Sequence, residues 1–386
     1  MKDQIRLFAA AVLVAAPTFL LSPSIGEQDS RTKSFTVSKG GNLEVTVEGG
    51  DIRINVWEKN EVLVQVEGID EEDLDRLKMD QRGNTVRVEF RRPRGWWSDG
   101  HMRFEITLPS DFNAELRTSG GDIEIRGSLS GTIKGATSGG NVTLGNLKGG
   151  KVDLSTSGGD MRTGDIQGDV TLRTSGGDIE LGKVGGEVYV STSGGDIRVE
   201  SVGKKLKATT SGGNIDVGDV GGEARVSTSG GDVKVRRVSG SASLSTSGGN
   251  IQLESASGEV KANTSGGDIR LEDISGSVDA STSGGEVVAE LKPTGKGRSK
   301  LASSGGEITL YIPESAKATI DATIRIQGRW RSRRDEYKVR SDFKAELYEK
   351  DEDGEEIRAR YVLNGGGEDI RLETVNSDIK ILKLKK

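Results

Sequence analysis

Hydrophobic and polar residues alternate along most of the chain in short runs. In one representative stretch, Ile179 and Leu181 flank a glutamate, and Val188 and Val190 follow with the same alternation. A period of two over about five residues is typical of a β-strand with one buried and one exposed face. No hydrophobic stripe with the 3.6-residue period of a helix occurs in residues 113–312. The pattern therefore predicts short strands and no helix over this region.

The tripeptide Ser-Gly-Gly recurs through the same region at a nearly constant interval. From Ser157 to Ser283 the copies follow one another at a constant 18-residue interval, and the spacing is slightly longer before and after this run. Each 18-residue unit divides into two similar halves, and each half reads as a short strand followed by a turn. We expect Gly-Gly to supply the positive backbone angles of a tight turn, and the adjoining Ser or Asp to bond the turn backbone. The eleven copies begin at Ser119, Ser138, Ser157, Ser175, Ser193, Ser211, Ser229, Ser247, Ser265, Ser283 and Ser304.

Strands this short are not stable alone, because ordering an 18-residue unit costs more free energy than its few buried aliphatic side chains contribute. Stacking the units about 4.8 Å apart lets every strand hydrogen-bond to units on both sides. The sequence thus predicts an all-β protein, a single-chain parallel β-solenoid (β-helix) of about ten 18-residue coils over residues 113–310. Whether each coil has two faces or three stays open.

The segments on either side of the coils differ from them in composition, and we interpret both as β-rich caps. The N-terminal cap covers residues 27–112 and the C-terminal cap residues 311–386, and each contains one degenerate repeat unit. We expect one short helix from Asp70 to Met79 and a longer strand from Tyr337 to Leu347. The acidic run from Glu349 to Glu356 suits a solvated hairpin tip.

Residues 1–26 have the features of a signal peptide. A short basic start precedes an apolar run from Leu7 to Leu21, which is shorter than the roughly 20 residues that a membrane-spanning helix needs. Small residues just before Glu27 suit cleavage there, and an uncleaved membrane anchor is the alternative. We expect an exported protein of the periplasm, the cell surface or the medium, with no transmembrane span in the mature chain.

Composition limits the chemistry. The 386 residues include no Cys and a single His, His101, which excludes thiolate zinc sites, Cys nucleophiles, disulfides and clusters of several histidines. An Asp or Asn follows most Gly-Gly pairs, as at Asp178 and Asn214, and these residues would stack in one column. We expect them to bond the turns rather than calcium, because the second Gly-x-Asp of calcium-binding rolls is missing. We expect no catalytic residue, cofactor or metal site.

Several motifs resemble the bacterial putative-adhesin family. They are the export signal, the opening Gly-Gly-Asp-Ile-Arg-Ile, the repeated Thr-Ser-Gly-Gly-Asp-Ile, and the ending Asn364-Gly-Gly-Gly followed by Thr374-Val-Asn-Ser-Asp-Ile. The resemblance covers roughly residues 34–384, and the family tends to show Gly where this chain has Ser377. It implies a β-helical protein of the envelope or surface, related to adhesin head domains, and it transfers no catalytic residue.

The sequence thus favours an exported structural or adhesive binding module of the cell envelope without catalytic activity. One alternative is a β-helical scaffold that self-assembles end to end, although distinct caps oppose strand-edge pairing between copies. A further alternative is a polysaccharide-active β-helix enzyme, but seven regular intervals leave no insertions for the walls of a groove. The repeated Thr-Ser pairs, as at Thr174-Ser175, suit either a structural ladder or a polar surface for glycans or another envelope protein.

Two segments outside the coils combine Arg with Trp, and we take them as candidate ligand contacts. Exposed Trp flanked by Arg suits an acidic glycan or an anionic lipid surface, whereas nucleic acid is a weaker candidate and a protein partner stays open. The competing interpretation is a capping hairpin whose Trp covers the last coil. The candidate residues are Arg91, Arg92, Arg94, Trp96 and Trp97 in the first segment, and Arg329, Trp330, Arg331, Arg333 and Arg334 in the second.

Overall fold

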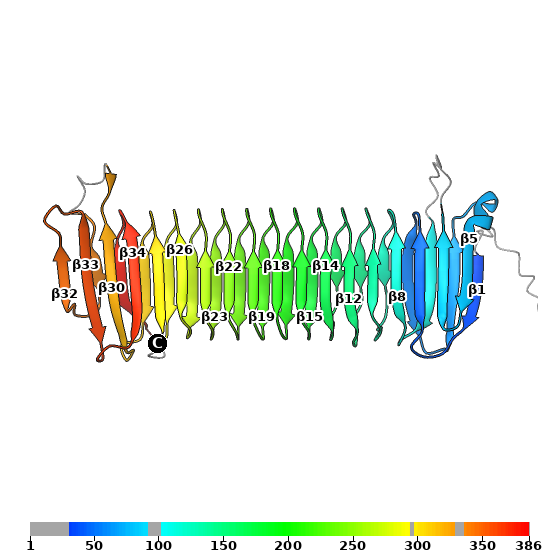
Figure 1. Cartoon of the computed structure of the whole chain (residues 1–386), viewed down its shortest axis with the longest axis horizontal. Helices are drawn as coiled ribbons and strands as arrows, with labels where there is room; N and C mark the ends of the chain where they lie inside the picture. Colours follow the sequence, from blue (N-terminus) through cyan, green and yellow to red (C-terminus); the bar gives the residue numbers. More distant parts are fainter. Residues whose placement is uncertain (1–30, 92–101, 294–296, 329–335, 386) are drawn as a thin grey trace, which may run out of the picture.

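The computed structural model describes residues 31–91, 102–293, 297–328 and 336–385, which form one straight rod (Figure 1). Strands account for 56% of the chain and helix for 2%. Most strands are parallel to their neighbours and stack along the rod, which confirms the expected all-β parallel solenoid. The expected signal peptide, residues 1–26, lies outside the described residues. Within the described ranges, no helix is long and apolar enough to cross a membrane.

Each coil contributes one strand to each of two sheets, so a coil has two faces. In one coil, β15 (Ile179–Val184) belongs to sheet A and β16 (Val188–Ser191) to sheet B. The next coil repeats them as β17 (Ile197–Val202) and β18 (Leu206–Thr209). Partners in the two ladders are one repeat apart, as Ile179 and Ile197 are, so the same position of the repeat stacks from coil to coil.

Sheet A has 17 strands and sheet B has 18, and both extend along the whole rod. From the N-terminal to the C-terminal end, the order in sheet A is β1 (Arg31–Thr36), β4 (Glu61–Glu67), β7 (Arg103–Pro109), β3 (Asp51–Trp57), β9 (Ile123–Ile125), β11 (Val142–Leu144), β13 (Met161–Thr163), β15, β17, β19 (Ile215–Val220), β21 (Val233–Val238), β23 (Ile251–Ala256), β25 (Ile269–Ile274), β27 (Val287–Leu291), β29 (Ile308–Ile312), β35 (Ile379–Lys383) and β31 (Val339–Ser341). The order in sheet B is β5 (Leu77–Arg82), β6 (Thr85–Phe90), β2 (Asn42–Val47), β8 (Asn113–Thr118), β10 (Ile133–Ala136), β12 (Lys151–Ser155), β14 (Asp169–Arg173), β16, β18, β20 (Ala224–Ser227), β22 (Ala242–Ser245), β24 (Val260–Asn263), β26 (Val278–Thr282), β28 (Arg298–Ser303), β34 (Glu368–Val375), β30 (Ala318–Arg325), β33 (Glu356–Leu363) and β32 (Leu347–Lys350).

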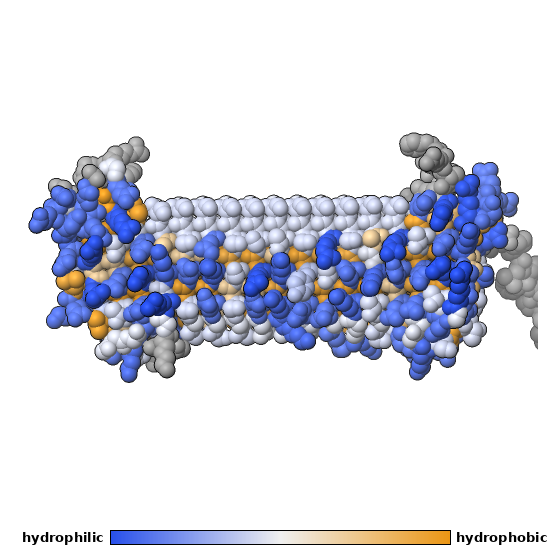
Figure 2. Space-filling view, in the orientation of Figure 1, coloured by the Kyte–Doolittle hydropathy of each residue, from blue (hydrophilic) through white to orange (hydrophobic). Residues whose placement is uncertain are grey.

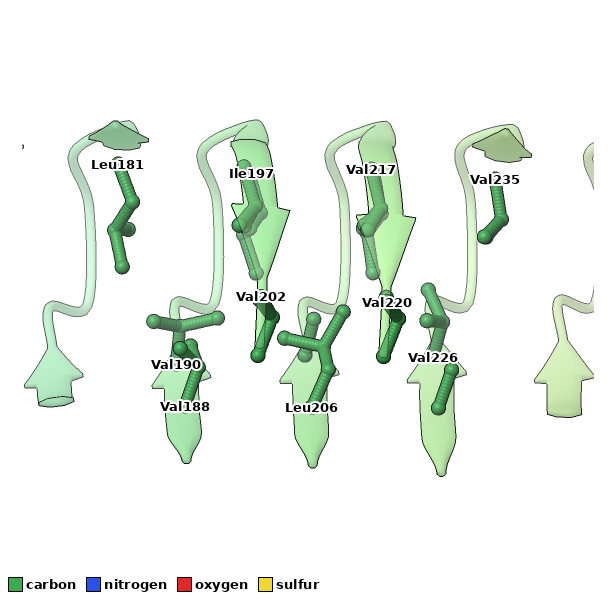
Figure 3. Close-up of a cluster of buried hydrophobic side chains, with 14 of the residues drawn as sticks. Leu181, Val188, Val190, Ile197, Val202, Leu206, Val217, Val220, Val226 and Val235 are labelled. Carbon is green, nitrogen blue, oxygen red and sulfur yellow. The ribbon is translucent and has the colours of Figure 1, made fainter. Parts of the chain in front are cut away.

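The core is a continuous layer of aliphatic side chains between the two sheets (Figure 3). Ile197 and Val202 point inward from sheet A and Leu206 points inward from sheet B, and none is more than 2% exposed. Burying one such side chain contributes about 1.5–3 kcal/mol. Larger buried rings lie in the N-terminal cap, where the centroids of Phe90 and Phe104 are 6.2 Å apart. The coils are therefore held by stacked aliphatic rows, and the cap by a thicker aromatic cluster.

The second glycine of each coil turn is required by close packing, and the expected positive backbone angle is wrong for these turns. Neither glycine of the Ser-Gly-Gly turns from 119 to 306 lies in the left-handed φ region. A Cβ on Gly177 would lie 2.1 Å from the carbonyl oxygen of Gly159 in the preceding coil. A Cβ on Gly176 would meet the corresponding oxygen of Gly158 at 3.3 Å. The second position thus has no room for a side chain, because the backbones of adjacent coils touch there.

The terminal coils do not stack in sequence order. At the N-terminal end, the coil of β2 and β3 lies between the coil of β6 and β7 and the coil of β8 and β9. At the C-terminal end, β34 lies between β28 and β30, and β35 lies between β29 and β31. The two degenerate repeat units are therefore full coils, each clamped between neighbours. The expected division into residues 27–112, 113–310 and 311–386 stays a prediction.

Antiparallel strands close three of the four sheet ends. β1 pairs antiparallel with β4 in sheet A, and β5 and β32 pair antiparallel with β6 and β33 at the two ends of sheet B. The fourth end, β31, is a short parallel strand, Val339–Ser341. Short or charged edge strands disfavour pairing with another chain. The ends of the rod thus differ from its repeating interior in strand direction as well as in composition.

Residues 70–79 form less helix than expected. A 3₁₀-helix, η1, spans Glu71–Arg76, and β5 begins immediately after it at Leu77. Leu77 pairs with Phe90 in the antiparallel ladder between β5 and β6. Because the ladder satisfies the backbone hydrogen bonds of these residues, sheet pairing overrides the helical spacing of the sequence.

The expected strand from Tyr337 to Leu347 is also shorter, since only β31 and the first residue of β32 fall within it. Between them, the backbone N–H of Phe343 donates to Ser341 Oγ at 3.0 Å, which turns the chain out of sheet A. The expected acidic hairpin tip is confirmed. It joins the antiparallel strands β32 and β33, and Asp351, Glu352 and Asp353 are exposed.

One carboxyl group, that of Glu368, is buried in the clamped C-terminal coil. Its side chain is 2% exposed, and Oε1 accepts a hydrogen bond from Ser299 Oγ at 2.8 Å. Ser299 Oγ in turn accepts the backbone N–H of Val278 at 3.0 Å. Burial raises the pKa of Glu368 above its usual range, and the hydrogen bond from Ser299 offsets part of that rise. Compared with the unfolded chain, the folded state therefore shifts the equilibrium of Glu368 towards the neutral acid.

We expect the substitution Glu368→Gln to change how stability depends on pH. From the pKa of an unfolded Glu, about 4.3, up to the raised folded value, the folded state binds more protons than the unfolded state. The free energy of unfolding contributed by Glu368 is therefore present at low pH and is lost as pH rises through this window, by about 1.4 kcal/mol per unit of pKa shift. The stability of the variant minus that of the wild type should rise with pH in urea titrations. A flat or falling difference would contradict the prediction.

Candidate functional site

The long edge where the Ser-Gly-Gly turns connect sheet B to sheet A, here called the turn edge, is held by buried threonines. Thr174 Oγ1 donates to the carbonyl of Gly159 at 3.0 Å and accepts the N–H of Gly177 at 3.3 Å. This confirms the structural interpretation of the threonines, whereas the serines beside them are exposed. Figure 2 shows the result as a smooth, pale strip along the upper edge of the rod. The buried threonines of this column are Thr118, Thr137, Thr156, Thr174, Thr192, Thr210, Thr228, Thr246, Thr264 and Thr282.

The Asp and Asn column beside this edge hydrogen-bonds one coil to the next. Asp160 Oδ1 accepts the backbone N–H of Asp178 at 3.0 Å, and Asp178 Oδ1 accepts that of Asp196 at 2.8 Å. Asn214 Oδ1 does the same for Asp232 at 2.9 Å. Only a side-chain oxygen is needed, so Asn serves as well as Asp, and the expected turn-bonding role is confirmed. Among the residues that the structure describes, no group of three or more His, Asp or Glu is placed to hold a metal ion.

Charged side chains on the outer face of sheet A largely neutralise one another. In one stacked column Glu180, Arg198 and Asp216 succeed each other at corresponding positions of adjacent coils. Such alternation avoids like charges opposite each other in a parallel, in-register stack. Arg236 Nε lies 2.8 Å from Asp219 Oδ1, and this hydrogen bond holds the pKa of Asp219 below its usual range. Asp219 and Glu180 are thus engaged by cations of the same face.

Most of the first candidate segment, and all the named residues of the second, lie outside the described residues. Arg91 is exposed and directly follows β6. The positions outside the described ranges are Arg92, Arg94, Trp96 and Trp97, and Arg329, Trp330, Arg331, Arg333 and Arg334. Their role as ligand contacts stays a prediction.

The strands that flank these two segments place their attachment points on the turn edge. The first segment connects β6 of sheet B to β7 of sheet A, and the second connects β30 of sheet B to β31 of sheet A. In the coils the connection from sheet B to sheet A is the Ser-Gly-Gly turn. The strands that flank the two segments therefore meet the same long edge, but at opposite ends of the rod (Figure 1).

A groove on the outer face of sheet B was missed as a candidate site. It encloses about 320 Å³ beside Tyr189, and Arg173, Lys207, Ser191 and Thr209 line it. Tyr189 is 40% exposed. The signal was present in the sequence, since alternation with Val188 and Val190 places this ring on the outer face. We call this feature the Tyr189 groove.

Sheet A carries a wider groove of about 590 Å³, whose cations are already paired. Arg162 and Arg198 each lie close to the Asp two positions earlier, at 3.0 Å and 3.1 Å, and Arg236 bonds Asp219. Gly182 and Gly218 line this groove, and their lack of side chains leaves the outer surface of sheet A recessed there. Because the arginines of this groove are already paired with carboxylates, they attract an anionic ligand less strongly than the cations of the Tyr189 groove do.

The solved structures that are similar to this chain share little sequence with it. A putative adhesin from Bacteroides fragilis is 19% identical, with a TM-score of 0.41 over 58% of this chain and 96% of that one. A putative adhesin from Parabacteroides distasonis is 14% identical, with a TM-score of 0.33 over 66% and 98%. A putative lipid binding protein from the same species is 13% identical, with a TM-score of 0.23 over 93% and 98%. No curated protein matches the chain significantly.

The family comparison covers nearly the whole rod. The profile of Toastrack DUF4097 matches residues 41–220 and matches again over residues 203–382. The first match begins beside β2, the second ends within β35, and their overlap, 203–220, has the length of one coil. From the clamped first coil to the clamped last coil, the chain belongs to the Toastrack DUF4097 family.

Proposed function

We propose that the protein is an exported structural and binding module of the cell envelope that works without catalysis. The observation that carries the proposal is the position of the strands that flank the two Arg–Trp segments. β6 and β7 lie near one end of the rod, β30 and β31 lie near the other, and each pair is connected across the turn edge. A continuous core and in-register ladders make the rod a stiff spacer. Such a spacer can present two similar contact points to one extended surface.

The Arg and Trp side chains of the two segments indicate which classes of ligand they suit. Arg pairs with carboxylate and phosphate through a planar fork of donors, and Trp adds a flat apolar surface. An acidic glycan, an anionic lipid surface or another envelope component meets both requirements. The outer face of sheet A is largely self-neutralised, as the Arg236–Asp219 pair illustrates. Two weak contacts on one rigid body also reinforce each other when both are engaged.

The proposal is non-catalytic because several carboxylates on the outer faces of the rod, among them Glu124, Asp219 and Asp273, are engaged by neighbouring cations. Burial alone would raise the pKa of Glu124, but hydrogen bonds from Arg126 and Arg53 hold it below its usual range. A general acid of a polysaccharide-cleaving enzyme needs the opposite shift at an exposed site. The raised pKa of Glu368 belongs to a buried side chain inside the C-terminal coil.

End-to-end assembly is a second candidate, favoured by one observation at the C-terminal end. Leu347 and Tyr348 on the edge strand β32 are 41% and 50% exposed, and Val362 on the adjacent strand is 41% exposed. An exposed edge strand with apolar residues can pair with another chain. Sedimentation velocity at increasing concentration separates the two candidates, because end-to-end assembly produces species longer than one rod and the binding module stays a monomer.

We expect the mature protein to bind envelope fractions saturably at low salt, and the quadruple change of Arg329, Arg331, Arg333 and Arg334 to Ser to weaken binding by about tenfold or more. Cosedimentation with membrane and wall fractions measures it. The matched control changes four exposed arginines of sheet A, namely Arg162, Arg198, Arg237 and Arg270, to Ser, which removes the same charge. Equal effects of both sets, or no binding by the parent, would contradict the proposal.

A further inference from the structure

We propose that the Tyr189 groove is a binding subsite for an acidic saccharide, a polymer or oligomer of uronic acids. The inference rests on the proposed binding function and names a ligand class and a site for it. The site lies on sheet B in the N-terminal half of the rod, within the regular coils, and is independent of the Arg–Trp segments. Its parts are an exposed aromatic ring, two cations and two hydroxyl groups.

The ring of Tyr189 is a stacking platform that the fold does not need for its core. Its neighbours Val188 and Val190 are buried and fill the space between the sheets, whereas Tyr189 points outward and is 40% exposed. The hydroxyl donates to Glu187 Oε2 of the same coil at 3.5 Å, which leaves the faces of the ring for other contacts. Flat apolar faces of this kind bind the apolar face of a sugar ring, and recognition sites combine aromatic walls with few polar groups.

Cations flank the ring on both sides along the rod. Lys207 stands directly opposite Tyr189 in the following coil, and Arg173 stands opposite Ser191 in the preceding coil. The two cations are therefore two coils apart, roughly 10 Å at a strand spacing of about 4.8 Å. Lys207 is exposed and has no ion-pair partner among the described residues, while Arg173 is 59% exposed and lies 3.1 Å from Asp153. An incoming carboxylate thus meets an unneutralised ammonium and a guanidinium with free donors.

Hydroxyl groups complete the groove. Ser191 and Thr209 face outward from the same two strands and are opposite each other in the ladder between β16 and β18. Both are half-buried beside the ring, so they can exchange hydrogen bonds with sugar hydroxyls. The groove is open along the face, as an extended polymer requires. The sugar ring of a uronic acid can thus stack on Tyr189, its carboxylate can pair with Lys207 or Arg173, and its hydroxyl groups can bond to the hydroxyl groups of the groove.

A comparison of the coils shows that the aromatic ring at position 189 is not part of the repeat. The column that contains Tyr189 has Thr171 before it, and Lys207, Arg225 and Ser243 after it. Every other described coil position of this column thus lacks a ring, and the groove is confined to the coils around Tyr189. Substitutions that copy neighbouring coils should fold, because each new residue already occupies the same position of the repeat.

The experiment uses the mature full-length protein and short oligogalacturonides, with neutral galacto-oligosaccharides of equal length as the comparison ligand. Isothermal titration at low salt measures affinity for the wild type and for Tyr189→Thr, Lys207→Ser and Lys261→Ser. The last variant removes the same charge from the same column three coils away, where Lys261 is exposed and unpaired within the described ranges. Circular dichroism melting verifies that each variant is folded.

We expect Tyr189→Thr to weaken oligogalacturonide binding about tenfold and Lys207→Ser about fivefold, the latter loss shrinking as salt is added. Lys261→Ser should bind like the wild type, and the neutral sugars should bind more weakly to all of them. Equal affinity of Tyr189→Thr and the wild type would overturn the inference, as would equal effects of the two lysine changes. Envelope binding without oligogalacturonide binding would overturn this site alone, and absence of both would overturn the proposed function as well.

Discussion

A chain from which residues 199–216 are deleted should fold into a soluble rod that is one coil shorter and nearly as stable. The deletion joins Arg198 to Val217, and Val217 then stacks on Leu181 as Val199 did. Inward positions stay inward, and each remaining coil contacts only its new neighbours, while Arg198 then stands opposite Lys234 and adds one exposed like-charge contact. Urea unfolding followed by circular dichroism should give a midpoint close to that of the wild type.

Deleting residues 199–215 instead, one residue fewer, should abolish the stable rod. Asp216 then follows Arg198 and occupies the inward position against Leu181. A buried, unpaired carboxylate or a slipped strand costs about 3 kcal/mol or more, because slippage turns every following inward side chain to solvent. The native chain shows where a spare residue is tolerated, since the longer interval between Ser138 and Ser157 has its extra residue at the turn containing Gly149 and Gly150. Equal unfolding midpoints of the two deletion variants would contradict this account of register.

The change Gly121→Ala should be severe, whereas Gly120→Ala in the same turn should be nearly silent. A Cβ on Gly121 would lie 2.0 Å from the carbonyl oxygen of Gly50, while one on Gly120 has nothing within 4 Å. That same carbonyl accepts the hydroxyl of Thr118 at 2.9 Å, so displacing it breaks the threonine ladder as well. We expect a loss of about 3 kcal/mol for Gly121→Ala.

The comparison is well controlled because both glycines lie outside the left-handed φ region and share one turn. Differences in unfolded-state entropy between the two alanine variants therefore cancel. Urea titration and susceptibility to limited proteolysis measure the effect near the junction of the N-terminal cap and the coils. If both variants unfold at the same urea concentration, contact between adjacent backbones is not what requires the second glycine.

The coils could be predicted from the repeat because each position of the 18-residue unit has the same neighbours in every coil. Alternation at Ile197 and Val199 indicated the inward positions correctly. The number of faces stayed open because the third inward residue of sheet A, Val202, breaks the alternation after two outward residues. Val202 packs in the core between the two sheets, and the residue pattern along one strand does not show how many sheets enclose that core.

The ends could not be derived from periodicity, because their partners are distant in sequence. Leu43 pairs with Ala114 of β8, with five strands of the chain between β2 and β8, and nothing in the local pattern selects that strand over β10. The helix expected at residues 70–79 is shorter for the same reason, since antiparallel pairing with β6 decides the conformation of Leu77. Local propensity is overridden wherever a strand partner is available.

The candidate site was predicted only in part. Composition drew attention to Arg and Trp outside the coils, and of those named residues only Arg91 lies within the described ranges. The groove beside Tyr189 was missed, because a single outward ring in the repeat forms it together with Arg173 of the preceding coil and Lys207 of the following coil.

The clamped terminal coils have a mechanical consequence. In an ordinary solenoid, tension on a chain end peels the outermost coil first, and the coils then detach one after another like a zipper. Here tension on the C-terminus acts on β35, which hydrogen-bonds to β29 on one side and β31 on the other. The strand can leave only by sliding between two partners, so many hydrogen bonds resist at once. The rod is therefore expected to resist unravelling from this end under a pulling force that would peel the outermost coil of an ordinary solenoid.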